Sequence, residues 1–114
     1  MTDQEVFDKV VTALRGQHYK SYKNGICAYR GRKGRKCAAG HLIPDELYDE
    51  EMEGKIWSDV CIMSPVLDRL PEYLVAELQK IHDECSINSW EKQWKTLAQR
   101  YNLKYTPPER TNND

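Results

Sequence analysis

The sequence predicts an α+β domain in which a small antiparallel β-hairpin or sheet packs against three or four helices. Apolar residues recur at helical spacing in three segments, and short β-compatible runs flank a glycine-rich turn. The chain has 114 residues, 39% of them hydrophobic, which is enough for one core. We therefore expect a single globular domain over residues 1–104. Residues 105–114 lack apolar periodicity and are predicted to be a disordered tail.

Three helices are predicted from their caps and apolar stripes. Thr2 and Glu5 have the spacing of a capping box, which predicts a helix start. Gly16 is a typical stop for this helix. Pro71 starts a second helix, and Asn88 or Ser89 caps a last one. Asn102 can close this last helix. The stripes that should pack together are Leu74, Leu78, Ile81 and Cys85 in one helix and Trp90, Trp94, Leu97, Ala98 and Tyr101 in the other.

The middle of the chain is predicted to hold shorter elements. Pro44 can occupy the first turn of a short acidic helix that runs to about Glu53 and is broken by Gly54. Residues 55–63 suit either a buried helical turn or a strand. Ser64 followed by Pro65 is typical of a helix start.

The predicted β-hairpin has its tip at the basic segment Gly31-Arg32-Lys33-Gly34. A three-residue loop would set Cys27 opposite Cys37, and a two- or four-residue loop would shift that register by one. Gly40 then allows a bend before the next element.

Charge is divided unevenly along the chain, although the net charge is only −1. From Lys9 to Pro44 there are nine Lys and Arg residues and no acid, whereas from Asp45 to Cys85 there are twelve acids and three basic residues. Such a division either neutralises itself by folding back or presents two faces of opposite sign.

The cysteines and histidines form a weak metal pattern. Zinc sites usually take two closely spaced ligand pairs, and the chain offers only loose ones. The candidate ligands are Cys27, Cys37, His41, Cys61, His82 and Cys85. We expect no bound metal and no cofactor, with structural or reduced thiols instead. If a metal is present, Cys27, Cys37 and His41 are its first candidate ligands; a redox pair of Cys27 and Cys37 is the other alternative.

The sequence does not favour an enzyme. Cys27 or Cys37 with His41 would supply a thiol and a base, but no residue is positioned to orient the histidine and no oxyanion-hole loop is recognisable. The carboxylates from Asp45 to Glu53 could hold a cation or act in acid–base chemistry, but a solvated acidic helix face explains them equally well. Phosphate-loop, dinucleotide and metalloprotease motifs are missing from the sequence.

The basic hairpin and the start of the acidic run are the best candidates for a partner-binding surface. Basic residues interleaved with Gly and Tyr suit phosphate contacts and base stacking, while an acidic protein partner or the chain's own acidic half would attract the same charges. A solvated hairpin tip is a further interpretation, and a pI near 6.3 is low for a dedicated DNA-binding protein. The candidate residues are Tyr29, Arg30, Arg32, Lys33, Arg35, Lys36, Asp45 and Tyr48.

One stretch resembles a known group of proteins. Cys27-Ala-Tyr-Arg-Gly31, Gly34-Arg-Lys-Cys-Ala-Ala-Gly40, Leu42-Ile-Pro-Asp45 and Met52-Glu-Gly54 look like the core of small uncharacterised proteins of bacteriophages and prophages. The likeness covers residues 27–54. That family has no assigned activity, so the resemblance transfers no functional residue. It implies a viral accessory role in which a small protein binds and modulates a host machine, for example a defence or CRISPR component.

We therefore expect a non-enzymatic phage-type accessory protein that binds a host protein or ribonucleoprotein. A nucleic-acid-binding module that acts through residues 29–36 is the alternative, and a zinc-stabilised regulatory protein is the third. The acidic, amphipathic start is unlike a secretory signal, and no apolar run approaches the length of a membrane span. The expected location is the cytoplasm of a bacterial host.

Overall fold

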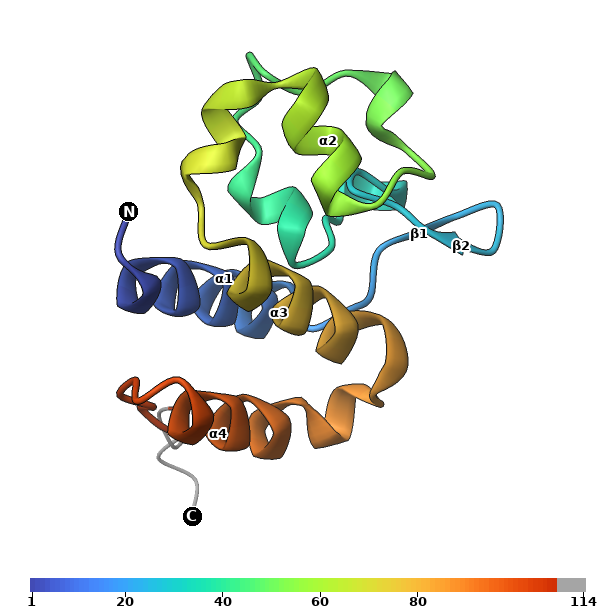
Figure 1. The fold of residues 1–114 in the computed structure, drawn as a ribbon. Helices are drawn as coiled ribbons and strands as arrows, with labels where there is room; N and C mark the ends of the chain where they lie inside the picture. Colours follow the sequence, from blue (N-terminus) through green and yellow to red (C-terminus); the bar gives the residue numbers. More distant parts are fainter. Residues whose placement is uncertain (109–114) are drawn as a thin grey trace.

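The computed structural model describes residues 1–108 and confirms the predicted fold class (Figure 1). In this range the chain forms four α-helices: α1 (Asp3–Gln17), α2 (Trp57–Met63), α3 (Glu72–Glu84) and α4 (Trp90–Arg100). Strands β1 (Tyr22–Lys23) and β2 (Ile26–Cys27) form a small antiparallel sheet. Short 3₁₀ turns connect these elements at Arg32–Gly34, Ala39–Leu42, Glu50–Met52, Pro65–Arg69 and Ile87–Ser89.

Helix α1 forms as predicted from its cap. The Thr2 hydroxyl accepts a hydrogen bond from the Glu5 N–H, and the Glu5 carboxylate accepts one from the Thr2 N–H, which completes the capping box. The helix continues one residue past Gly16 and ends where His18 adopts a left-handed conformation with φ 58°. Its buried stripe consists of Val6, Phe7, Val10, Val11 and Leu14.

Helix α3 packs against α1 and α4, and α2 lies on the side away from α4 with the 3₁₀ turns between residues 32 and 69 (Figure 1). The predicted packing of α3 on α4 is confirmed, because Leu74, Leu78, Trp94 and Leu97 are all buried to 1% exposure or less. The ambiguous segment 55–63 resolves as α2, whose Trp57, Val60 and Cys61 are buried.

The hairpin has its turn at a different place from the predicted one. Lys23 pairs with Ile26, so Asn24 and Gly25 form a two-residue turn, and both have positive φ (56° and 78°). Asn-Gly is the preferred pair for such a turn, since both positions require a left-handed conformation. The predicted tip at residues 31–34 is instead a 3₁₀ turn inside a wider loop closed by one bridge between Arg30 and Lys36. The predicted register, with Cys27 opposite Cys37, would place Arg30 opposite Gly34. Arg30 instead pairs with Lys36, so that register does not form.

The predicted acidic helix from Pro44 to Glu53 does not form. A hydrogen-bonded turn follows Pro44, Asp49 is extended, and only Glu50–Met52 makes a 3₁₀ turn, which the Asp49 side chain caps at the Glu51 N–H. Carboxylates spaced four apart, as at residues 45 and 49 or 46 and 50, repel along a helix. Ser64–Pro65 likewise begins a 3₁₀ turn rather than an α-helix.

The start of the predicted tail is attached to the domain. The Tyr105 hydroxyl donates to Glu91 at 2.6 Å, and the Arg15 guanidinium donates to the Thr106 carbonyl at 2.7 Å. The rest of the predicted tail, 109–114, lies outside the described residues. Among residues 1–108, no helix combines the length and apolar character needed to cross a membrane.

Candidate functional site

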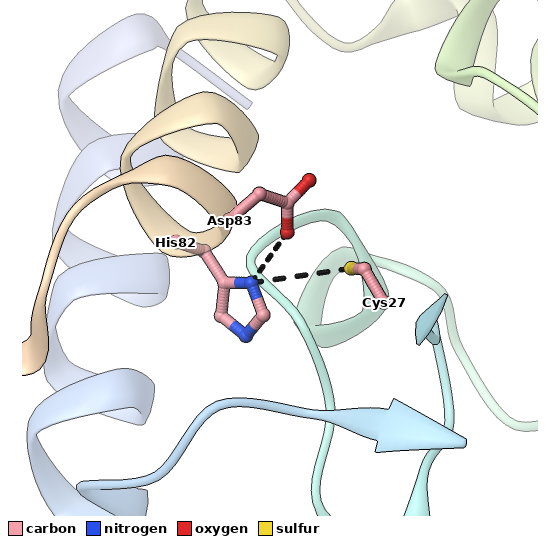
Figure 2. A group of neighbouring side chains, drawn as sticks. All are labelled: Cys27, His82 and Asp83. Carbon is pink, nitrogen blue, oxygen red and sulfur yellow. Dashed lines mark hydrogen bonds and ion pairs between the residues drawn. The ribbon is translucent and has the colours of Figure 1, made fainter. Parts of the chain in front are cut away.

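A buried polar network surrounds His82 on α3 (Figure 2). The ring is 0% exposed, and its Nε2 lies 3.1 Å from the Ser21 backbone N–H, which can only donate. Its Nδ1 lies 2.7 Å from the Asp83 carboxylate and 4.0 Å from the Cys27 sulfur. A neutral imidazole has one donor and one acceptor nitrogen. Nε2 must therefore accept, and Nδ1 carries the proton that it donates to Asp83.

The charge states of this network follow from its contacts. Burial raises the pKa of Asp83, but hydrogen bonds with His82, Cys27 and Gln79 outweigh burial and lower the pKa overall. Burial lowers the pKa of His82, while Asp83 and Cys27 outweigh it and raise the pKa. A second ring proton would nevertheless sit on Nε2, directly against the Ser21 N–H. The Ser21 contact thus opposes the second proton that Asp83 and Cys27 favour.

Cys27 is not activated as a nucleophile by this arrangement. The His82 nitrogen nearest its sulfur already carries a proton, so it cannot accept the thiol proton. The Cys37 thiol and burial raise the pKa of Cys27 well above its ordinary value. The Gln79 amide donates to the sulfur at 3.2 Å. The thiol therefore stays protonated near neutral pH.

The structure does not bring together the predicted metal set of Cys27, Cys37 and His41. His41 lies 3.1 Å from the Gln17 side-chain oxygen and donates to it, and the Cys37 sulfur accepts from the Gly40 N–H at 3.3 Å. The group whose ligand atoms lie within 4.8 Å of one another is Cys27, His82 and Asp83. A metal on Nδ1 would require the proton on Nε2, against the Ser21 N–H. The donor set therefore does not fit a cation.

A cavity of about 410 Å³ adjoins the network. Its volume falls in the range of small-molecule pockets. Part of its polar lining is already hydrogen-bonded, since the Gln79 amide donates to Cys27 and Asp83 and the Tyr29 hydroxyl donates to the Lys55 carbonyl. The charged residues Lys80 and Glu84 also line the cavity.

The basic and acidic runs meet at Arg30. Its guanidinium forms an ion pair with Asp45 at 2.7 Å and lies 4.5 Å from the centre of the Tyr48 ring. The backbone N–H groups of Tyr29 and Arg30 both donate to the Glu53 carboxylate, which also accepts from the Tyr48 hydroxyl. Four of the predicted partner-binding residues thus hold the fold together at this junction, and Tyr29 is buried.

The other four predicted residues form the cationic loop, which we define as residues 31–36. Arg32 and Lys33 are exposed. Arg35 places its guanidinium 4.0 Å from the centre of the Tyr19 ring. The Lys36 backbone is paired with the Gln17 side chain through two hydrogen bonds. None of the ion pairs found among residues 1–108 involves a side chain of this loop.

The cationic loop is held in one shape by close backbone contacts. The Gly31 N–H donates to the Arg35 carbonyl at 2.8 Å, and Lys33 adopts a left-handed conformation. A Cβ on Gly31 would lie 2.5 Å from the Ser21 hydroxyl, so only glycine allows this approach. The same hydroxyl lies 3.2 Å from the Arg35 carbonyl, and the Ser21 N–H is the donor to His82. The buried network therefore supports the loop.

Sequence reasoning missed several residues of this region. Their roles depend on contacts between distant parts of the chain, for which the sequence carries no local signal. The one hint in the sequence was the presence of two tyrosines, Tyr19 and Tyr22, shortly before the basic segment. The missed residues are Gln17, Tyr19, Ser21, Glu53, Gln79 and Asp83.

Comparison with known proteins gave no relative: no family model, no curated protein and no solved structure matches this chain.

Proposed function

We propose that the chain is a non-enzymatic accessory protein of the phage type that binds a host protein or ribonucleoprotein through the cationic loop and modulates it. The observation that carries this proposal is the unpaired charge of the loop. Arg32, Lys33 and Arg35 stand on a backbone that is held in place, and none of them forms an ion pair within the described chain.

The alternative role for these charges was to neutralise the chain's own acidic run. Among the ion pairs of residues 1–108, the one that joins the basic run to the acidic run is Arg30 with Asp45. Exposed cations without partners attract an anionic surface and speed its association. A preformed loop also loses less conformational entropy on binding than a flexible one.

The non-enzymatic character is supported by the state of the cluster of Cys27, His82 and Asp83, which resembles a catalytic site. In that cluster the pKa of Cys27 is raised and the nearest nitrogen of His82 is already protonated. A nucleophilic cysteine requires the opposite arrangement.

The test compares two charge reversals that change the net charge equally. The loop variant carries Arg32→Glu, Lys33→Glu and Arg35→Glu. The control variant carries Arg69→Glu, Lys92→Glu and Lys95→Glu, all at exposed positions outside the loop. Each tagged protein is incubated in bacterial lysate, and retained proteins and RNA are identified. Thermal unfolding checks that both variants fold, since surface changes usually cost within about 0.5 kcal/mol each.

We expect wild type and the control variant to retain the same partner and the loop variant to lose it. Raising the salt concentration should weaken retention, because exposed charges are screened within about 10 Å at 0.1 M salt. Identical retention by all three proteins would overturn the proposal, as would retention of nothing by the wild type.

A further inference from the structure

Tyr19 presents an exposed aromatic ring next to the cationic loop. It lies just beyond the end of α1, and 52% of its surface is exposed. The Arg35 guanidinium lies 4.0 Å from the ring centre, and the His18 ring approaches it edge-on at 6.1 Å. No hydrogen bond within residues 1–108 involves the Tyr19 hydroxyl. Burial therefore does not explain this ring, and its neighbours are groups that stack with planar ligands.

An open groove of about 530 Å³ runs beside the same ring. The residues that line it are His18, Tyr19, Lys20, Ser86, Ile87 and Asn88. The groove thus combines an aromatic face, a cation and polar side chains. These are the groups that recognise a nucleobase and its phosphate together.

The cations and the aromatic side chains share one surface because of a close backbone approach. Gly31, at the start of the cationic loop, lies against Ser21 and Tyr22, so the loop is fixed beside the segment that carries Tyr19. Tyr22 adds a second ring, which is 40% exposed. Basic side chains interleaved with exposed rings are typical of surfaces that bind single strands.

We infer that the ligand of this surface is single-stranded nucleic acid, with a base stacked at Tyr19 and its phosphates on Arg35, Arg32, Lys33 and Lys20. This inference rests on the proposed function and names the chemistry of the partner. An acidic protein would satisfy the cations but would leave the exposed ring and the groove without a role. A duplex hides the faces of its bases, which a stacking site needs. The pI near 6.3 averages a basic and an acidic half of the chain and does not describe this surface.

The test measures fluorescence anisotropy of labelled 12-nucleotide oligothymidine, oligouridine and a duplex DNA of equal length, from 50 to 200 mM salt. Both single strands should bind more tightly than the duplex. The slope of log affinity against log salt should be about −3, from about −0.7 for each of four phosphate contacts. The relative affinity of the two single strands shows whether the sugar is read.

Point variants separate stacking from charge. Tyr19→Ala should weaken binding roughly 5- to 100-fold, as expected for the loss of one stacked base. Tyr19→Phe keeps the ring and should bind like wild type. Tyr73→Ala, at another exposed tyrosine on α3, should have no effect. Thermal unfolding confirms that each variant is folded.

Several outcomes would overturn this inference. They are no single-strand binding at 50 mM salt, equal binding of duplex and single strands, and an unchanged affinity in Tyr19→Ala. If one of these occurs while the loop variant still loses its partner from lysate, the partner is an acidic protein and the proposed function stands. If the oligonucleotides bind as expected but the loop reversal leaves lysate capture unchanged, the proposed function fails.

Discussion

His41 should make the stability of this protein depend on pH in a defined window. Burial, together with the positive charges of Lys36, His82 and Lys9, lowers the pKa of its ring from 6.5 to about 4. The unfolded chain therefore binds this proton first as the pH falls below 6.5, so stability is lost between pH 6.5 and 4. The difference between the two pKa values sets an upper limit of about 3 kcal/mol.

The measurement is urea unfolding at pH 7.5 and 5.0, followed by tryptophan fluorescence, for wild type and His41→Gln. Glutamine keeps a donor for the Gln17 oxygen that His41 contacts. Wild type should lose about 1–2 kcal/mol more than the variant over this interval, once partial exposure of the ring is taken into account.

Asp83 and Glu91 do not affect this comparison. Their pKa values are lowered, so their contribution is lost as the pH falls below the ordinary values of 3.8 and 4.5, in wild type and variant alike. His82, with its raised pKa, contributes stability that is lost as the pH rises above 6.5. Its charge also acts on the His41 ring, so the coupling between the two rings is part of the measured difference. Equal loss of stability in the two proteins between pH 7.5 and 5.0 would refute the reasoning.

Three further predictions concern packing and thiol chemistry. Trp94 is 1% exposed, so Trp94→Ala should lower the free energy of unfolding in urea by about 3–5 kcal/mol. A decrease below about 1 kcal/mol would contradict its place in the core. Gly40→Ala should destabilise by about 3 kcal/mol or more, because its Cβ would lie 2.1 Å from the Tyr29 carbonyl oxygen. In the matched control Gly16→Ala, the added Cβ meets nothing within 4 Å and should stabilise α1 by about 0.5–1 kcal/mol. A destabilised Gly16→Ala, or a Gly40→Ala variant as stable as wild type, would show that the packing described around these glycines is wrong. Cys27, whose pKa is raised, should resist iodoacetamide at pH 7.5 in the folded protein and react after unfolding, as followed by mass spectrometry, and rapid labelling of the native thiol would argue for an activated one.

The helices could be predicted from the sequence because their signals are local. The capping box at Thr2 and Glu5 uses residues three apart, and the apolar stripe of α4 repeats within one element. The end of α4 also follows its local signal: Asn102 adopts φ 55°, and the Leu103 N–H donates to the Ala98 carbonyl at 2.7 Å.

The hairpin was misplaced because two glycine-containing turns compete in this region. The segment with more charge and more glycine drew the prediction to residues 31–34, whereas Asn24-Gly25 has the conformational preference that a two-residue turn needs. The acidic helix failed for a different reason. Glu53 accepts hydrogen bonds from Tyr29 and Arg30, and this contact between distant segments requires the chain to bend.

Of the candidate site, the sequence could predict the charges but not what positions them. The charge division left open whether the two runs would neutralise each other, and the pairing of Arg30 with Asp45 shows one place where they do. His82 was considered only as a metal ligand, because the Ser21 N–H that fixes its proton lies 61 positions away in the chain. Tyr19 was not among the candidate residues, since its stacking partner Arg35 is 16 residues further along.

The buried histidine and the exposed tyrosine depend on each other through Ser21. The Ser21 backbone donates to His82, and its hydroxyl lies against both Gly31 and the Arg35 carbonyl. Arg35 in turn stacks on Tyr19. A cation on a flexible loop would lose rotamer and backbone freedom when it binds, which subtracts from its affinity. Because the fully buried Ser21 packs against the loop backbone, the backbone part of that entropy is lost during folding rather than during binding. In the proposed function, the interior network therefore contributes to recognition without contacting the ligand.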